Sequence, residues 1–279
     1  MRSLRRFAYY LRSVGTLLAH FGSPASVAGT FLARGRLDPR VVRLRSSGLR
    51  FLVRNRMDIW VIKETCIDRD YERCGVPLED GWNVIDVGAG IGDFSVLAAH
   101  ASPRGAVHAY EPFPGSFALL QRNIGLNGVA NVTAFEEAIS GPQTELFLDL
   151  SDVAEVRHVT RRVDDTTHPP SGRRLNVSSI TLKEAIARLP GSRCHLLKLD
   201  CEGAEFDIIL ASDDASWEAV DRVVGEYHEG PQTGSSSALV AALSDRGFDA
   251  RRSPNPYRRD VGFIYAEKRS RDARPVALS

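Results

Sequence analysis

The 279-residue chain is poor in cysteine, has no excess of either charge and lacks a long apolar run. Its four cysteines have no metal-site spacing and form no Cys-x-x-Cys pair, so we interpret them as free thiols and expect a reducing, cytoplasmic location. The formal net charge of +1 argues against a dedicated nucleic-acid binder, although an RNA substrate stays open. No apolar run reaches the about 18 residues that a transmembrane helix needs.

The N-terminus combines positive charge with a short apolar patch at residues 14–21. Gly15 and His20 interrupt this patch, which is short for a signal peptide. A basic amphipathic helix lying on a membrane surface is a second interpretation. We favour a third, in which a helix packs on the main domain or on a second copy in a homodimer. The arginines that precede the patch are Arg2, Arg5, Arg6 and Arg12.

After residue 82 the sequence alternates between strand-like and helix-like segments, which is typical of an α/β domain with a parallel sheet. Apolar, β-branched runs predict strands, and periodic runs that end in turn residues predict helices. The expected strands are 83–87, 106–110, 131–135, 195–199 and 222–226, then a last pair that opens at Gly247 and ends with 261–266. The expected helices are 94–101, 115–126, 181–189, one from Gly203, and 235–246.

The N-terminal part predicts a separate extension. Residues 1–47 favour an arginine-rich, helical extension, followed by the main domain over residues 48–267. A short strand is expected at 48–54, and Asp58 is expected to cap a helix that runs toward Cys66.

Two further segments depart from the alternating pattern. Residues 140–179 have little periodicity and predict one strand, at 144–148, within a lid or an added hairpin. Residues 268–279 predict a disordered basic tail.

The most informative segment is Asn83-Val-Ile-Asp-Val-Gly-Ala-Gly-Ile-Gly-Asp-Phe-Ser95, a strand that ends in a glycine turn before a helix. This arrangement holds nucleotide-like ligands at the carboxyl edge of an α/β sheet. Asp86 lies inside the strand, and Glu111 closes the next one. Two carboxylates without a basic phosphate clamp indicate a ligand with hydroxyl groups and positive charge.

The glycine spacing separates the candidate ligands. A dinucleotide fingerprint has its third glycine one residue later, where Asp93 would face a pyrophosphate, and no Lys-Ser/Thr follows as in a phosphate loop. The pattern resembles instead the S-adenosylmethionine (SAM) motif of Rossmann-like methyltransferases. The helix N-terminus would take the methionyl carboxylate, the glycines would admit the adenosyl group, and Glu111 would accept from the ribose hydroxyls. A plain glycine-rich turn is the structural alternative.

A second acidic cluster follows the strand at 195–199, where Asp200 and Glu202 precede the helix that Gly203 begins. Because ligands bind beyond the carboxyl ends of parallel strands, both side chains are expected at the cleft that the glycine turn borders. The alternative for Glu202 is that it only caps the helix. Cys201 is expected to face the other way, as a small core residue.

His228 closes the fifth expected strand, next to the strand that carries Asp200. We expect it across the cleft from the methyl donor, where a histidine with a near-neutral pKa suits removal of a proton from a substrate hydroxyl. A structural or solvated histidine is the alternative. Asp200, Glu202 and Glu226 are also hard oxygen donors that can hold Mg²⁺. Carboxylates alone do not distinguish a metal from a sulfonium, and we assign no metal site.

Several motifs taken together, in order over roughly residues 80 to 230, resemble the FkbM family of methyltransferases. Glu-Pro after the second strand, combined with Lys-x-Asp-x-Glu-Gly-Ala-Glu after the fourth, is the most specific pair. The matching segments are Val84-Ile-Asp-Val-Gly-Ala-Gly-Ile-Gly, Ala109-Tyr-Glu-Pro-Phe-Pro, Leu120-Gln-Arg-Asn-Ile-Gly-Leu-Asn, Glu137-Ala-Ile-Ser, Ile180-Thr-Leu, Leu197-Lys-Leu-Asp-Cys-Glu-Gly-Ala-Glu and Glu226-Tyr-His. Lys183 and Asp93 depart from the residues that relatives usually carry.

The resemblance implies a seven-stranded, Rossmann-like domain and SAM-dependent methylation, usually at oxygen, of sugars or natural-product scaffolds. The methionine moiety would lie at the glycine turn, the ribose and adenine at the second and third strand ends, and the transferred methyl group at the fourth. The SAM-binding residues would then be Asp86, Gly88, Ala89, Gly90, Gly92, Glu111, Pro112, Phe113, Glu137, Ala138 and Asp200. The catalytic residues would be His228, Asp200 and Glu202.

The expected reaction is in-line transfer of a methyl group from the sulfonium of SAM to a hydroxyl group of a small substrate. Because an alcohol is a poor nucleophile, a base should take its proton, and His228 or Asp200 is expected to do so. One alternative is an N-methyltransferase that acts on a peptide or small amine and needs no strong base. A second is a non-catalytic SAM-binding scaffold. The glycine spacing disfavours a third, a nicotinamide oxidoreductase.

Overall fold

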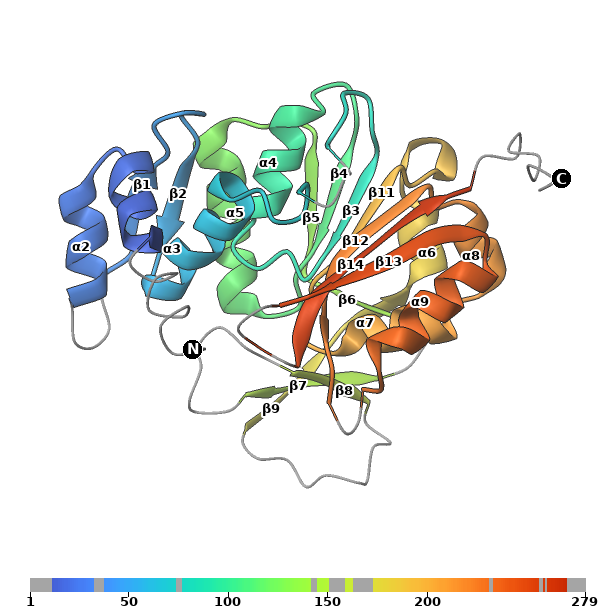
Figure 1. Ribbon diagram of the computed structural model, residues 1–279. Coiled ribbons are helices and arrows are strands. Elements are labelled where there is room, and N and C mark those ends of the chain that lie inside the picture. Colours follow the sequence, from blue (N-terminus) through green and yellow to red (C-terminus); the bar gives the residue numbers. More distant parts are fainter. Residues whose placement is uncertain are drawn as a thin grey trace, which may run out of the picture.

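The computed structural model describes residues 12–32, 38–73, 77–141, 145–150, 159–162, 173–230, 233–255, 258 and 260–269. Its centre is a seven-stranded sheet (Figure 1). The strand order is β13 (Phe248–Pro254), β14 (Val261–Lys268), β12 (Arg222–His228), β11 (Leu196–Leu199), β3 (Val84–Val87), β4 (Val107–Tyr110) and β5 (Val132–Phe135). The run from β12 to β5 is parallel, and β14 is antiparallel to both its neighbours. The predicted α/β fold with a seven-stranded, Rossmann-like sheet is confirmed.

Helices cover both faces of this sheet, which is why β3, β4 and β11 are buried along their whole length. On one face lie α4 (Asp93–Ala101) and α5 (Pro114–Asn127). The other face carries α6 (Leu182–Ala187), α7 (Ala204–Ala211), α8 (Asp214–Glu218) and α9 (Ser236–Asp245) (Figure 1). The sequence predicts all of these helices except the short α8, which Asp213 caps. A 3₁₀ turn at Pro190–Ser192 leads from α6 to β11.

The N-terminal segment is only partly helical. Residues 12–20 and α2 (Pro24–Leu32) are helices, but β1 (Arg40–Arg43) pairs antiparallel with β2 (Arg50–Val53). The expectation of helix throughout is therefore wrong at residues 40–43, where Val41 and Val42 favour extended backbone. The next helix, α3 (Arg56–Ile62), continues as a π-helix over Lys63–Ile67.

Asn55, rather than Asp58, caps α3. Its side chain accepts from the backbone N–H groups of Met57 and Asp58. Asp58 lies one turn further on, where its carboxylate receives the Arg54 guanidinium and the Arg54 backbone N–H. Asp58 therefore fixes the entry to the helix without being its cap.

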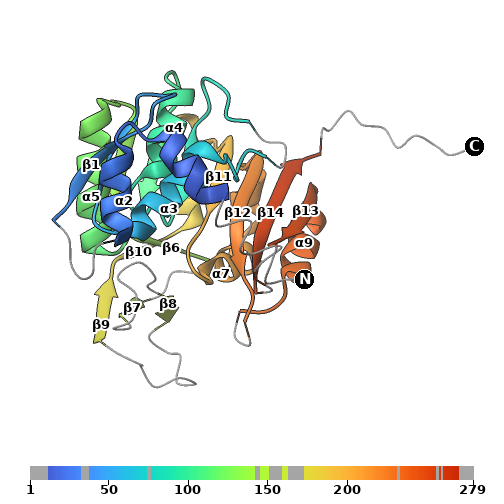
Figure 2. The same ribbon diagram turned by 60° about the vertical axis from the view of Figure 1, so that its left-hand side comes forward.

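The N-terminal elements pack on the face that carries α4 and α5 (Figure 2). Phe21, Val42 and Phe51 share one buried cluster with Ile91 and Leu119 of the main domain. The patch at 14–21 is thus split, because Leu17 and Phe21 are buried whereas Val14 and Leu18 are 52% and 44% exposed. Residues 1–11, with three of the N-terminal arginines, lie outside the described residues.

The insertion forms a small sheet of its own, apart from the main sheet in Figure 2. It consists of β7 (Leu146–Leu150), flanked on both sides by the antiparallel β8 (Val159–Arg162) and β9 (Arg173–Val177). At its base β6 (Ala138–Ser140) pairs with β10 (Ser179–Thr181). The single strand expected at 144–148 overlaps β7, whereas the pattern predicts neither β8 nor β9.

At the other end, Lys268 is the last residue of β14 and the Arg269 N–H donates to the Gly247 carbonyl at 3.0 Å, so the expectation of disorder is wrong for these two residues. Residues 270–279 lie outside the described residues. Within the described part of the chain, no helix has the length and apolar character needed to cross a membrane.

A buried ion pair joins the two central strands. The Lys198 ammonium lies 2.9 Å from the Asp86 carboxylate, and the two side chains are 4% and 0% exposed. Lys198 also donates to the Gly88 carbonyl at 3.0 Å, and Ser95 donates to Asp86 at 2.5 Å. Burial opposes the charge on Lys198, but Asp86, Asp200 and Asp93 together outweigh it and raise the pKa of the ammonium. Through these buried contacts, Asp86 and Lys198 together fix β3 and the glycine turn that follows it.

Replacing Lys198 with Met is expected to lower the free energy of unfolding by about 3–5 kcal/mol, because it leaves the Asp86 carboxylate buried without its cation. Urea unfolding followed by circular dichroism measures this loss. Lys183→Met is the matched control, because the Lys183 ammonium meets Asp213 at the surface, where the two side chains are 69% and 49% exposed. This control should change stability little. Equal losses in the two variants would contradict the prediction.

Candidate active site

One cavity of about 190 Å³ lies beyond the carboxyl ends of β3, β4, β11 and β12. This is where open α/β sheets bind their ligands. Val61, Glu64 and Thr65 of α3 and the π-helix close it from the N-terminal side, and Leu148 of β7 reaches it from the insertion. The described lining includes eight carboxyl groups but only two basic side chains, Arg54 and Lys198. Such an excess of acid suits a cationic ligand.

The glycine turn forms one wall of the cavity. Gly88 has φ of 71°, and a β-carbon there would lie 1.9 Å from the backbone oxygen of Asp200. Gly88 therefore brings the ends of β3 and β11 together as no other residue can. Ala89 and Gly90 line the cavity beside it, and a β-carbon on Gly90 would meet no atom within 4 Å. Gly92 is not among the lining residues; it begins α4 against Leu120 and so fixes the helix.

Glu111 lies in the next wall, at the end of β4. Its two carboxylate oxygens accept from the Gly90 and Phe113 backbone N–H groups at 2.8 and 2.9 Å. Burial outweighs these hydrogen bonds and raises the pKa of Glu111 to about 7. Pro112 and Phe113 line the cavity beside it.

The third wall differs in part from the sequence prediction. Ala138 of β6 lines the cavity, as expected of an adenine-binding position. Glu137 is not among the described lining residues. It forms an ion pair with Arg188, in which Nη1 donates to Oε2 and Nη2 donates to Oε1 at 3.3 Å. The Arg188 guanidinium in turn lies 4.9 Å from the centre of the Phe135 ring.

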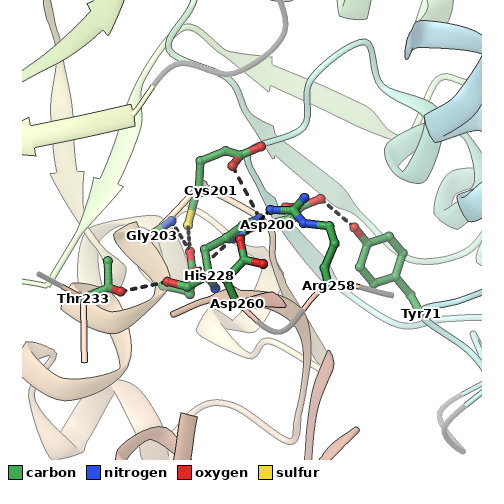
Figure 3. A network of polar contacts seen from close by, with 10 residues as sticks. Tyr71, Asp200, Cys201, Gly203, His228, Thr233, Arg258 and Asp260 are labelled. Carbon is green, nitrogen blue, oxygen red and sulfur yellow. Dashed lines mark hydrogen bonds and ion pairs between the residues drawn. The ribbon is translucent and has the colours of Figure 1, made fainter. Parts of the chain in front are cut away.

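Asp200 occupies the wall opposite Glu111, and Tyr71 holds it. The Tyr71 hydroxyl donates to Oδ2 of Asp200 at 2.7 Å (Figure 3). The Tyr71 ring packs edge-on against Phe94 and Phe263, with centroids 5.4 and 5.8 Å away, so its hydroxyl has a fixed direction. Tyr71 was missed by the sequence reasoning, because nothing in its local pattern marks a residue that contacts another 129 positions later.

His228 lies between two carboxylates instead of facing the cavity freely. Its Nδ1 is 3.1 Å from Glu205 and its Nε2 is 3.4 Å from Glu202. Burial lowers the pKa of the ring, but Glu205, Asp200 and Glu202 together raise it to about 9. The expected near-neutral pKa is therefore wrong. At neutral pH the ring is an imidazolium and has no lone pair with which to take a proton.

The turn between β11 and α7 directs Glu202 toward His228. Glu202 has φ of 52°, a left-handed conformation that is uncommon outside glycine. The N-cap of α7 is Gly203, which has no side-chain cap, and the Gly203 N–H donates to the carboxylate of Glu205 in the first turn at 2.8 Å. The alternative that Glu202 only caps α7 is thus not supported. Cys201 lines the cavity rather than facing away, and its thiol donates to Glu205 at 3.6 Å.

One group in the described part of the chain has the geometry of a metal site: donor atoms of Asp200, Glu226 and His228 lie within 4.8 Å of one another. Burial, and then the charge of Asp200, raise the pKa of Glu226 to about 8. Mg²⁺ prefers oxygen ligands, and one of these three donors is a histidine nitrogen, so this arrangement gives the Mg²⁺ alternative little support. A cationic ligand that is not a metal ion would also be favoured next to the buried carboxyl groups of Asp200 and Glu226.

The cavity fits SAM. Gly90 leaves open space along the turn, and Glu111 lines the cavity where it could accept from hydroxyl groups of the donor. The clustered carboxyl groups of Asp200, Glu202 and Glu226 suit the sulfonium and would repel a pyrophosphate. This arrangement on a seven-stranded sheet defines a Rossmann-like methyltransferase.

Comparison with known proteins identifies the family. Residues 86–250 match the family model described as the methyltransferase FkbM domain. The chain is 28% identical to Methyltransferase 1 of Beauveria bassiana over 203 residues, covering 68% of this chain and 80% of that protein. It is 29% identical to the 31-O-demethyl-FK506 methyltransferase FkbM of Streptomyces tacrolimicus over 212 residues, covering 68% and 81%. Among solved structures it is similar to SAM-bound magnesium protoporphyrin IX methyltransferase of Synechocystis PCC 6803, with a TM-score of 0.42 and 10% identity over 92% of this chain and 96% of that chain.

The chain belongs to the FkbM family of SAM-dependent methyltransferases, on the strength of the sequence match over residues 86–250. The resemblance read from the motifs is therefore confirmed. Methyltransferase sdnD of Sordaria araneosa is a further relative, 28% identical over 219 residues, covering 69% of this chain and 83% of that protein.

Proposed function

We propose that this protein transfers the methyl group of SAM to a hydroxyl group on a small molecule such as a sugar or a natural-product scaffold. The observation that carries the proposal is Asp200, a carboxylate in the cavity wall that Tyr71 orients beside the glycine turn. A hydroxyl group becomes a good nucleophile when a base takes its proton, and Asp200 is placed to accept it. The Streptomyces tacrolimicus relative is named as the methyltransferase of an O-demethyl compound, and this name accords with a hydroxyl acceptor.

SAM supplies a methyl group on a sulfonium that is already a good leaving group, so the residues of the protein contribute placement and proton removal. Glu111 would accept from the ribose hydroxyls of SAM, and the glycine turn, which lines the cavity with it, would admit the donor along its backbone. Leu148 and Val61 line the same cavity from the insertion and the N-terminal segment. These two segments are where acceptor choice is set, because connections on a rigid sheet vary with function.

Asp200, rather than His228, is the proton acceptor in this proposal. His228 already carries its proton at neutral pH, since its pKa is about 9. Its positive charge lies beside Asp200, with donor atoms of the two side chains within 4.8 Å of each other. Histidine then assists the base without acting as one.

The excess of carboxyl groups favours a second candidate, the methylation of an amine. An ammonium group on the acceptor would be attracted to the cavity wall formed by Glu64, Asp70 and Glu226. Such an acceptor would have to lose a proton before transfer, and Asp200 could again take it. The two candidates differ in the atom that receives the methyl group.

The proposal predicts micromolar binding of SAM and of its demethylated product, S-adenosylhomocysteine, and no binding of NAD⁺. Calorimetric titration measures all three. An acceptor panel of polyols and matched compounds with an amine at the same position, incubated with methyl-labelled SAM, then identifies the acceptor atom from the chemical shift of the transferred methyl group. Label on oxygen supports the proposal, label on nitrogen supports the second candidate, and binding of NAD⁺ alone would overturn both.

A further inference from the structure

Glu205 is a completely buried acid that does not line the cavity. It lies in the first turn of α7, and its carboxylate has four partners. Oε2 accepts from the Gly203 N–H at 2.8 Å and faces the Cys201 thiol at 3.6 Å. Oε1 accepts from the His228 backbone N–H at 2.7 Å and faces Nδ1 of the same residue at 3.1 Å.

These contacts fix both the place and the orientation of the His228 ring. The backbone contact ties the end of β12 to the start of α7, and Glu205 accepts a hydrogen bond from the Nδ1–H group of the imidazolium. Nε2 is then directed toward Glu202, at 3.4 Å, on the cavity side. The Thr233 hydroxyl holds the other side of the residue by donating to the His228 carbonyl at 2.8 Å (Figure 3).

We propose that Glu205 is a positioning residue that holds the His228 ring as a fixed imidazolium, with Nε2 directed at Glu202 and the positive charge beside Asp200 on the cavity side. This inference rests on the proposed function, because it places a fixed positive charge beside Asp200, the proton acceptor of that proposal. It also reverses the role that the sequence gives His228, from base to stationary cation.

The charges that face His228 come from every element packed around it. Glu205 belongs to α7, Glu202 and Asp200 to the turn after β11, and Glu226 to β12 itself. Asp260 lies before β14, where Arg258 pairs with it at 2.9 Å (Figure 3). Of these carboxylates Glu205 is the only one that is 0% exposed and does not line the cavity, so ligand binding will screen its charge least.

The test is a titration of the His228 ring by NMR, in protein without SAM or acceptor, with the resonance assigned by its loss in His228→Asn. In the wild type the ring should titrate near a pKa of about 9. In Glu205→Gln the pKa should fall toward the ordinary histidine value of about 6.5, because the amide still accepts from the backbone but carries no charge. Glu205→Asp keeps the charge at a greater distance and should give an intermediate value.

Glu229→Gln is the matched control. Glu229 follows His228 in the sequence, but its carboxylate accepts from the Ser236 N–H at 2.6 Å and does not contact the ring. This variant should leave the His228 titration and the turnover unchanged. In Glu205→Gln the turnover should fall about tenfold or more, because the His228 ring loses the charged contact that fixes it beside Asp200.

Two results would overturn the inference: a wild-type ring that titrates near 6.5, or an unchanged titration in Glu205→Gln. The wild-type measurement decides the matter even if the variant does not fold. The titration needs no acceptor, so it is separate from the proposed function. A protein that methylates no hydroxyl group but shows the expected titration would refute the proposed function and leave the Glu205–His228 pair standing.

Discussion

Replacing Asp200 with Asn should lower turnover by about 10²–10⁴-fold and leave SAM affinity within a few-fold. The substitution removes the negative charge that accepts the acceptor's proton, yet keeps an oxygen for the Tyr71 hydroxyl at the same place. The contact between Gly88 and Asp200 involves the backbone oxygen, so the glycine turn should keep its shape. Single-turnover transfer from labelled SAM, with calorimetry of SAM binding in parallel, measures both quantities.

Tyr71→Phe is the informative companion. It removes the hydroxyl that orients Asp200 but keeps the ring that packs against Phe94 and Phe263. We expect a loss of about tenfold, the scale of one hydrogen bond to a charged group. If Asp200→Asn retained full turnover while Tyr71→Phe did not, the base would have to be sought elsewhere, with Glu202 the next carboxylate in the cavity wall.

The fold and the donor site could be predicted from the sequence because both depend on local patterns. A buried strand, a glycine turn and a helix follow one another between residues 84 and 101, and each is specified by its own residues. Topology then brings Glu111 and Asp200 to one edge of the sheet, since the ends of parallel strands meet there. Asp86, Gly92 and Glu137 are the exceptions. They belong to the expected motifs but do not line the cavity: Asp86 pairs with Lys198, Gly92 packs on Leu120 and Glu137 pairs with Arg188.

The charge state of the site could not be predicted, because it depends on contacts between distant segments. Glu205 and His228 are 23 positions apart, and their 3.1 Å contact exists only when α7 packs beside β12. Glu205 is part of the motif after the fourth strand, but the spacing of the motif does not reveal that its side chain is completely buried. Lys198 carried a clearer signal, as a lysine within a wholly buried, apolar strand that must find an acidic partner.

The strand β1 escaped prediction for a related reason. Residues 40–43 form a strand because β2 pairs with them and Val42 joins a cluster that includes main-domain residues. A pattern as short as four residues with one buried position does not distinguish a strand from a helix. Tyr71 belongs to a different cluster, in which its ring packs against Phe94 and Phe263 while its hydroxyl reaches Asp200.

Replacing Glu111 with Gln should weaken SAM binding by about 10- to 100-fold, the loss of hydrogen bonds to a charged acceptor. Glu136→Gln is the matched control, because this exposed glutamate follows β5 and does not line the cavity. Its SAM affinity should equal that of the wild type. A similar loss of SAM affinity in the control, or no loss in Glu111→Gln, would mean that the ribose does not bind at the end of β4.

The pH dependence of binding sharpens this prediction. In the free protein the pKa of Glu111 is about 7 and that of Glu226 about 8, raised chiefly by burial. A bound sulfonium favours the ionised carboxylates and lowers both values, so the complex holds fewer protons than the free protein. Affinity for SAM should therefore rise with pH through both values, by up to about tenfold per pH unit for each group, and level off above them.

Glu111→Gln should remove the step near pH 7 and keep the step near pH 8, because Glu226 still titrates. Calorimetry in buffers of different ionisation enthalpy counts the protons released on binding. Release that is the same in wild type and variant would mean that Glu111 is already ionised in the free protein. The acidity of the cavity would then depend on Glu226 and its neighbour Asp200, where the sulfonium is expected to lie, rather than on the ribose end.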